Sequence, residues 1–245
     1  MNDRPPEPAT DWLAILDATW PAARVRRHGR WLLRDGQGGG QRVSATTPAG
    51  AGPDDIPAAE AAQAAQGLPP LFRLCLPRDA ELDASLAARG YLRHDPTAIL
   101  AVPVTALTDT PLPPLSAFPV WPPLAAQTAL WDTAGIGPAR RAVMARVPDP
   151  RTTILGRSGD RFAATAFVAL HGDMAMLHAL EVAPQMRRQG VATTMMRAAA
   201  HWAGAQGATR LAVAVTRANA PACALYAGLG MAEVGGYHYR IREGG

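Results

Sequence analysis

The sequence has 245 residues, of which 48% are hydrophobic and 18% are charged, so the chain can bury a sizeable core. Its net charge of +4 comes from scattered arginines without an aromatic stripe among them, which argues against a nucleic-acid partner. Two cysteines, Cys75 and Cys223, are too few for a disulfide framework or a cysteine metal site, so we expect reduced thiols and no metal in a cytoplasmic protein.

No apolar run in the sequence is long enough to span a bilayer, so we expect no membrane partner. Residues 1–9 are polar and rich in proline, which predicts a disordered tail.

The first hundred residues are predicted to alternate helices and strands, as α/β units do. Thr10 is expected to cap a helix that ends at Thr19. Apolar spacing and Gly or Pro stops predict strands at 31–34, 41–45 and 71–76, helices at 57–66 and 80–89, and an extended segment at 91–104.

A glycine-rich loop, DGQGGG at residues 35–40, joins the first two predicted strands. It could be taken for a phosphate cradle, but it lacks the Lys-Ser/Thr pair of a P-loop and no predicted helix follows it. A flexible hairpin turn is therefore the better interpretation.

The second half begins with residues 105–122, a proline-rich segment that is either a linker or an extended edge strand. We therefore expect two domains, a smaller α/β domain at 10–104 and a second domain at 105–245. Predicted elements of the second domain are helices at 124–133 and 138–147, strands at 152–156, 161–170 and 174–182, a helix after residue 190, a strand at 210–215, and a helix opened by Asn219.

Residues 187–192, Arg-Arg-Gln-Gly-Val-Ala, lie between a predicted strand and a predicted helix and fit the pattern [QR]-x-x-G-x-[GA]. The first N–H groups of a helix have no partner within the helix, and the helix dipole favours anions there. Gly190 lets the backbone approach a ligand closely, and Ala192 keeps the next position small. The run therefore predicts a pyrophosphate-binding arch; the alternative is an ordinary turn with two solvated arginines.

Two motifs in strict order carry a family resemblance. V-x-P-x-x-R-R-x-G-V-A begins at Val182, and N-x-x-A-x-x-L-Y-x-x-x-G-M begins at Asn219. Over roughly the last hundred residues the chain resembles the GNAT superfamily of acyl-CoA-dependent N-acetyltransferases. The resemblance implies an α/β fold of the α+β type: a mixed, mostly antiparallel sheet flanked by helices. The first half resembles, weakly, the degenerate GNAT-like halves of two-domain acetyltransferases.

The resemblance also implies acetyl-CoA as cosubstrate, held where the strand ending at Val182 splays from its neighbour. Tyr226 matches the family tyrosine that protonates the departing thiolate; its alternative role is packing. Asn219 matches a cofactor-contacting asparagine and is also a plausible helix cap. The implied cofactor-binding residues are Leu180, Val182, Arg187, Arg188, Gln189, Gly190, Val191, Ala192, Thr193, Asn219 and Tyr226.

The general base has two candidates, His178 and Glu181, which face opposite sides of a regular strand. The segment LHALEV resembles arylalkylamine N-acetyltransferases, whose histidine at the place of His178 relays a proton, and histidine titrates near neutrality. Glu181 could act instead if a bulge changes the phase of the strand. Structural alternatives are a core histidine and a solvated or arginine-paired glutamate.

The expected acceptor is a primary amine: a small molecule, an amino acid, or a peptide or protein amine. Tyr237, His238 and Tyr239 either line the acceptor side or are packing residues. A homodimer is compatible with the sequence. We therefore expect a bacterial N-acetyltransferase that works by direct attack in a ternary complex, and the alternative is a non-catalytic acyl-CoA-binding or regulatory module.

Overall fold

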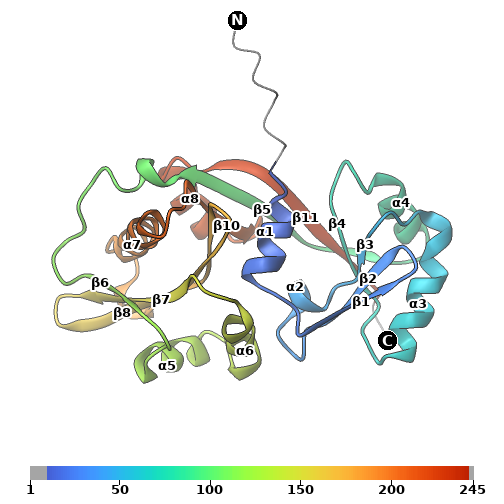
Figure 1. The fold of residues 1–245 in the computed structure, drawn as a ribbon, viewed down its shortest axis with the longest axis horizontal. Helices are drawn as coiled ribbons and strands as arrows, with labels where there is room; N and C mark the ends of the chain where they lie inside the picture. The colour runs from blue at the N-terminus through green and yellow to red at the C-terminus, as the bar shows by residue number, and fades with distance from the viewer. Residues whose placement is uncertain (1–9, 243–245) are drawn as a thin grey trace, which may run out of the picture.

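The computed structural model describes residues 10–242, and the predicted tail at residues 1–9 lies outside them. The molecule is elongated, and one sheet of eight strands runs through it in the order β4-β11-β5-β10-β9-β8-β7-β6 (Figure 1). These strands are β4 (Leu71–Leu74), β5 (Leu92–Pro103), β6 (Ala117–Val120), β7 (Arg151–Ser158), β8 (Arg161–His171), β9 (Met174–Val182), β10 (Arg210–Thr216) and β11 (Ala232–Ile241).

Antiparallel pairing dominates this sheet, with β9 and β10 as the parallel pair. Strand β5 comes from the first hundred residues, yet it lies between β10 and β11. The sheet is therefore continuous across the predicted boundary between residues 104 and 105, and the division into two domains stays a proposal. The proline-rich segment contributes β6, an edge strand that pairs with β7.

Helices cover both faces of the central strands. Helix α7 (Val191–Ala205) packs against β7, β8 and β9 on one face, and α1 (Trp12–Thr19) and α5 (Ala125–Thr133) pack against β8 on the other. Strand β8 is buried on both sides because its residues alternate between the two cores: Ala166 and Val168 face the α7 core, while Phe167 joins the opposite one. A helix from the first half thus covers the sheet of the second half.

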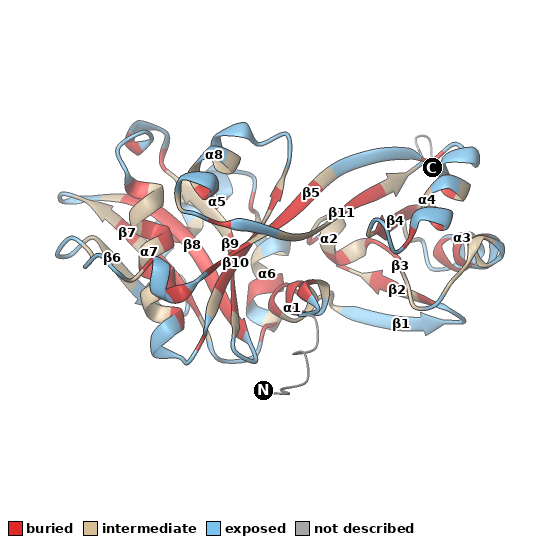
Figure 2. Cartoon of the chain, turned by 90° about the horizontal axis from the view of Figure 1, so that it is seen from above, coloured by how far each residue is buried: buried red, intermediate tan, exposed pale blue. Residues whose placement is uncertain are grey.

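A smaller sheet lies at the other end of the molecule and has its own core. Its first strand, Arg24–His28, is exposed along its whole length (Figure 2). The elements there are β1 (Arg24–His28), β2 (Trp31–Asp35), β3 (Thr47–Pro48), α2 (Gln41–Ser44), α3 (Ile56–Ala65), α4 (Ala80–Ala88) and the 3-10 turn η1 (Pro53–Asp55); the remaining elements are α6 (Pro138–Arg146), α8 (Ala220–Gly228), η2 (Val104–Ala106) and η3 (Pro184–Met186).

Three local predictions need correction. Residues 41–45 do not form a strand: 41–44 form the short helix α2, whose Ser44 hydroxyl donates to the carbonyl of Gly40. The cap of α1 is Asp11 rather than Thr10, because Asp11 Oδ1 accepts the N–H groups of Leu13 and Ala14 at 3.1 Å. Strand β1 was not predicted, since its exposed residues carry no apolar alternation.

The predicted fold class is confirmed, because the sheet is mixed, mostly antiparallel and flanked by helices. Within residues 10–242, none of the helices combines the length and the apolar character needed to cross a membrane.

Candidate functional site

Strands β9 and β10 separate halfway along their length. Their parallel pairing runs from Arg210 opposite Met174 to Val213 opposite Leu177 and ends there. Beyond that point β10 continues to pair with β5, and β9 continues to pair with β8. A gap therefore opens in the sheet between residues 178–182 and residues 214–216, as the family resemblance implies.

A β-bulge lies in β9 at the start of this gap. His178 pairs with Phe167 and Glu181 pairs with Thr165, so two residues of β9 face one residue of β8. Ala179 adopts a φ of 52° there, and its carbonyl accepts the indole N–H of Trp131 at 2.8 Å. The extra residue puts His178 and Glu181 on the same face of β9. The alternative in which Glu181 is the general base requires such a bulge.

His178 is buried and is held by the end of α1. Its Nε2 lies 3.0 Å from Thr19 Oγ1, and its ring lies 5.0 Å from the ring of Trp20. The Thr19 hydroxyl donates its single proton to the carbonyl of Ile15 at 2.8 Å, so it accepts from His178 and sets the Nε2–H tautomer. Nδ1 is then the atom with the free lone pair, and it has no hydrogen-bond partner among the described residues.

The surroundings of both candidate bases shift their pKa values. Burial lowers the pKa of His178 well below its usual 6.5, and the charge of Arg42 lowers it further, so the ring is neutral at pH 7. Burial raises the pKa of the half-buried Glu181, while Arg187 opposes that rise. The shift makes the neutral ring of His178 a weaker base than an exposed histidine, and it makes the carboxylate of Glu181 a stronger base than an exposed glutamate.

The predicted arch lies at the N-terminus of α7. Gly190 is the N-cap residue, with a φ of 76° and no side-chain cap, and Arg188 has a φ of 61°. A Cβ at Gly190 would meet nothing within 4 Å, so the space outside the first turn is open. Arg187 donates through Nε to the carbonyl of Val182 at 3.2 Å. Uncapped amides, a helix dipole and open space fit an anionic group such as a pyrophosphate.

Helix α8 carries the other two predicted residues. Asn219 is its N-cap, and its side-chain oxygen accepts the N–H of Ala222 at 3.2 Å, which confirms the capping prediction. Tyr226 is buried against the α7 core. Burial raises its pKa to about 12, with smaller contributions from Cys223 and Glu181. The phenol is therefore protonated at neutral pH.

A cavity of about 550 Å³ opens on the α1 side of the gap. His178 is the member of the predicted catalytic and cofactor set that lines it; the arch, Glu181 and Tyr226 lie outside its lining. Other lining residues come from both halves of the chain and include Trp20, Gly39, Gly40, Arg42, Asp95, Arg140, Thr216, Tyr237 and Tyr239.

The three C-terminal candidates, Tyr237, His238 and Tyr239, lie on two different faces of β11. Tyr237 and Tyr239 line the cavity, whereas His238 points to the other side of β11 and contacts Asp83 at 2.5 Å. Sequence reasoning on these residues left packing and acceptor roles open, and the cavity lining supports an acceptor role only for the two tyrosines.

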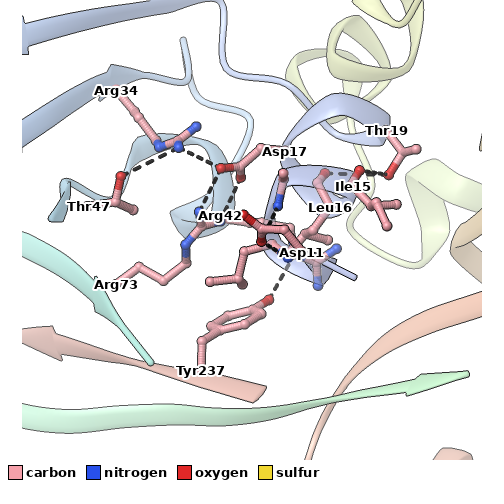
Figure 3. Close-up of polar contacts among 12 residues, drawn as sticks. Asp11, Ile15, Leu16, Asp17, Thr19, Arg34, Arg42, Thr47, Arg73 and Tyr237 are labelled. Carbon is pink, nitrogen blue, oxygen red and sulfur yellow. Dashed lines mark hydrogen bonds and ion pairs between the residues drawn. The ribbon is translucent and has the colours of Figure 1, made fainter. Parts of the chain in front are cut away.

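An ion-pair network fixes α1 over this cavity (Figure 3). Asp17 accepts two hydrogen bonds from Arg73 of β4, both 2.8 Å long, and one of 2.5 Å from Arg34 of β2. Asp17 lies two residues before Thr19, so the network positions the groups that contact His178. Arg42 Nε donates to the hydroxyl of Tyr237 at 3.1 Å in the same region.

Sequence reasoning missed the residues that the first half contributes to the site. Thr19, Trp20 and Arg42 lie 136 to 159 positions before His178, and no local motif connects them. The available signal was the glycine run at 38–40, which was interpreted as a flexible turn. In the structure Gly39 and Gly40 form part of the cavity wall.

Comparisons with known proteins agree with this geometry. Residues 117–231 match the sequence model of the acetyltransferase (GNAT) family. A Bacillus subtilis protein described as the uncharacterized N-acetyltransferase YobR is 26% identical over 248 residues, covering 94% of this chain and 96% of that protein.

Solved structures show the same fold over nearly the whole chain. A GCN5-related N-acetyltransferase from Kribbella flavida superposes with a TM-score of 0.69 at 20% identity, covering 94% of this chain and 93% of that one. A functionally unknown conserved protein from Staphylococcus epidermidis gives 0.68 at 9% identity, with 93% and 96% covered. Residues 117–231 are therefore the acetyltransferase (GNAT) family region of the chain, and the fold of the whole chain is shared with a GCN5-related N-acetyltransferase.

Proposed function

We propose that the protein is an N-acetyltransferase that transfers the acetyl group of acetyl-CoA to a primary amine by direct attack in a ternary complex. The observation that carries the proposal is the gap between β9 and β10. Helix α7 packs on one face of the sheet and the α1-covered cavity lies on the other. A thioester held in the gap would therefore reach the cavity while its pyrophosphate lies at the N-terminus of α7.

The cosubstrate would be held by backbone groups at both ends of this path. The amides after Gly190 would bind the pyrophosphate, helped by the charges of Arg187 and Arg188. The backbone of β9 from Leu180 to Val182 would hydrogen-bond the pantetheine chain, because this edge has lost its β10 partner. Asn219 and Tyr226 would face the sulfur end from α8.

In the reaction, the neutral amine nitrogen forms a bond with the carbonyl carbon of the thioester, and the carbon–sulfur bond breaks. The nitrogen gives one proton to a base, and the departing thiolate receives one from Tyr226. His178 Nδ1 fits the base role because Thr19 holds the other ring nitrogen protonated. Glu181, on the same face of β9, is the second candidate.

Release of free coenzyme A across a panel of amines tests the proposal. We expect amine-dependent release of coenzyme A together with one equivalent of acetylated amine, identified by mass spectrometry. Binding of acetyl-CoA in calorimetry with no turnover on any amine would instead indicate the non-catalytic acyl-CoA-binding module. Absence of acetyl-CoA binding would exclude both.

A further inference from the structure

We propose that the amine acceptor also carries a carboxylate, and that Arg42 and Arg140 bind this carboxylate in the cavity. The inference rests on the proposed acetyltransferase function and names the substrate class of the same site. Amino acids and related amino carboxylates are the compounds that fit it.

The first argument is the pairing of the arginines. Several arginines have a carboxylate within hydrogen-bond distance: Arg34 and Arg73 contact Asp17, and Arg240 contacts Asp83. Within residues 10–242, neither Arg42 nor Arg140 has a carboxylate within 4.0 Å, although both line the cavity. Arg42 is half-buried, whereas Arg140 is exposed at the rim of the cavity. A half-buried guanidinium without a counter-ion, such as that of Arg42, favours the binding of an anion.

The second argument is the fixed orientation of Arg42. Its Nε donates to Tyr237, whose ring lies 5.5 Å from that of Tyr239 in an edge-on arrangement. The guanidinium of Arg73 lies over the aromatic ring of Tyr237, 5.7 Å from the ring centroid. With Nε committed, the two terminal nitrogens of Arg42 form the fork that binds a carboxylate through two parallel hydrogen bonds.

The glycine-rich loop brings Arg140 to the same place. Gly40 has a φ of 98°, and a Cβ there would lie 3.5 Å from Arg140 Nε and 3.6 Å from Nη2. A Cβ at Gly38 would lie 3.3 Å from the Cβ of Ala139. The loop therefore packs against α6 and lies beside the Arg140 guanidinium at Gly40, which is two residues before Arg42 in the chain. Both arginines line the cavity. A side chain at Gly40 would strain the backbone, because the φ of 98° lies in the region that favours glycine, and its Cβ would be in van der Waals contact with this guanidinium.

The charge of the cavity supports an anion that also carries an amine. Its charged lining residues are Arg42, Arg140 and the half-exposed Asp95, so two positive groups face one negative group. His178 lines the same cavity, and its buried Nδ1 has no hydrogen-bond partner among the described residues. A molecule with its carboxylate on the arginines can thus present its amine toward His178, and Asp95 can attract the ammonium form as it enters.

Matched acceptor pairs test the inference. Lysine is compared with 1,5-diaminopentane and phenylalanine with 2-phenylethylamine, because each second compound lacks only the carboxylate. Aminoethylphosphonate against ethylamine tests whether another anion is accepted. For the wild-type enzyme we expect kcat/KM to be roughly 10- to 100-fold higher for the carboxylates, the range given by one or two hydrogen bonds to a charged group.

Variants then assign the preference to its residues. Arg42→Gln and Arg140→Gln should each remove most of it, mainly through KM, while leaving the affinity for acetyl-CoA unchanged. Arg42→Lys keeps the charge but loses the fork, so it should recover only part. Arg161→Gln, at the exposed start of β8 and outside the cavity lining, is the matched control and should keep the full preference.

The outcomes separate this inference from the proposed function. Equal kcat/KM values within each pair would overturn the proposed carboxylate site but would not contradict the proposed acetyltransferase activity. A kcat/KM that is higher for the phosphonate than for the carboxylates would show that the site prefers a phosphonate. If no amine is acetylated, calorimetry of lysine and phenylalanine with the wild type and Arg42→Gln still decides the matter. Binding that is lost in the variant supports the carboxylate site, and no binding to the wild type overturns it.

Discussion

The hydroxyl of Thr19 lies 3.0 Å from Nε2 of His178, so a helix of the first half sets the protonation of a residue in the second half. The direction of this bond follows from the donation of the same hydroxyl to the carbonyl of Ile15. Asp17, two residues earlier, anchors the helix to β2 and β4 through Arg34 and Arg73. The first half is therefore expected to support the chemistry of the site as well as its shape.

Replacing Thr19 by valine tests this relationship. Valine keeps the shape but leaves the Nε2–H of His178 buried without a partner, which frees the ring to change tautomer. If His178 is the base, we expect kcat to fall by roughly 10-fold or more, since a buried unsatisfied group costs about 1–3 kcal/mol. Thr19→Ser retains the hydroxyl and should restore most of the rate. Equal kcat and equal pH profiles for the two variants would leave the threonine a packing role.

The two candidate bases can be distinguished by pH profiles. If His178 accepts the proton, His178→Gln should lower turnover most at neutral pH and change the acidic limb, with little effect on acetyl-CoA affinity. The lowered pKa of His178 places that limb below pH 6.5, because the ring must be neutral to act. Removing the nearby positive charge in Arg42→Gln should raise this pKa and move the limb to higher pH. An unaltered profile, with the loss appearing in Glu181→Gln, would move the role to Glu181.

The sequence predicted the second half of the molecule better than the first for a physical reason. Residues 174–231 carry their signals locally: a short apolar strand, a helix cap at Asn219 and a glycine at the start of α7. The bulge at Ala179 in β9 has no local sequence signal, since the carbonyl of this residue accepts a hydrogen bond from Trp131 in the distant helix α5. Only the folded chain shows that His178 and Glu181 share a face.

Contacts between residues far apart in the sequence explain why parts of the first half were not predicted. Strand β5 was predicted as an extended segment, but its place between β10 and β11 depends on partners more than a hundred residues away. The helix α2 was predicted as a strand because its single buried residue, Val43, gives no helical period. Arg42 therefore could not be placed in the cavity from the sequence.

Substitution of Gly190 tests the proposed arch. Glu at this position would bring a side chain and a negative charge to the uncapped end of α7, so acetyl-CoA affinity should fall by at least about 10-fold. The φ of 76° also strains any residue with a Cβ, by about 1–2 kcal/mol. Gly190→Asn is the control, because asparagine tolerates this conformation and adds no charge. Unchanged affinity of the Glu variant in calorimetry would exclude a pyrophosphate site here.

A stability prediction concerns the link between α4 and the long strand β11. Asp83 accepts hydrogen bonds from Arg240 at 2.7 and 2.8 Å and contacts His238. The bonds from Arg240 lower its pKa to about 2. Asp83→Asn should reduce the free energy of unfolding by roughly 1–3 kcal/mol at pH 7, since it leaves a largely buried guanidinium without its counter-ion.

The same carboxylate gives a pH dependence with a definite sign. Its pKa is lower in the folded protein than its ordinary value, so its stabilising effect is complete above about pH 4 and is lost as the pH falls toward 2. The difference in urea midpoint between wild type and Asp83→Asn should therefore shrink over this range. Asp132→Asn removes the exposed partner of Arg141 and should change stability by less than about 1 kcal/mol. A difference that does not vary with pH would show that Asp83 acts by packing.

The last prediction concerns Tyr226 as the acid that protonates the departing thiolate. Its pKa of about 12 keeps the phenol protonated throughout the range in which amines are acetylated. Relative to a thiol in water, with a pKa near 8.5, the proton transfer would be uphill by about 3 to 4 pKa units. Tyr226 would therefore be effective as the acid only where the sulfur leaves in the same water-excluded surroundings, since burial also raises the pKa of a thiol.

Tyr226→Phe keeps the ring and its packing against the α7 core, so the fold should survive. Loss of a general acid typically lowers the rate by about 10²- to 10⁴-fold, and the loss should fall on kcat because the hydroxyl matters most as charge gathers on sulfur. Acetyl-CoA affinity should barely change. Aryl thioesters should lose less, because their thiolates leave with little protonation. If the variant acetylates amines from acetyl-CoA at the wild-type rate, in single-turnover experiments that isolate the chemical step, Tyr226 is a packing residue.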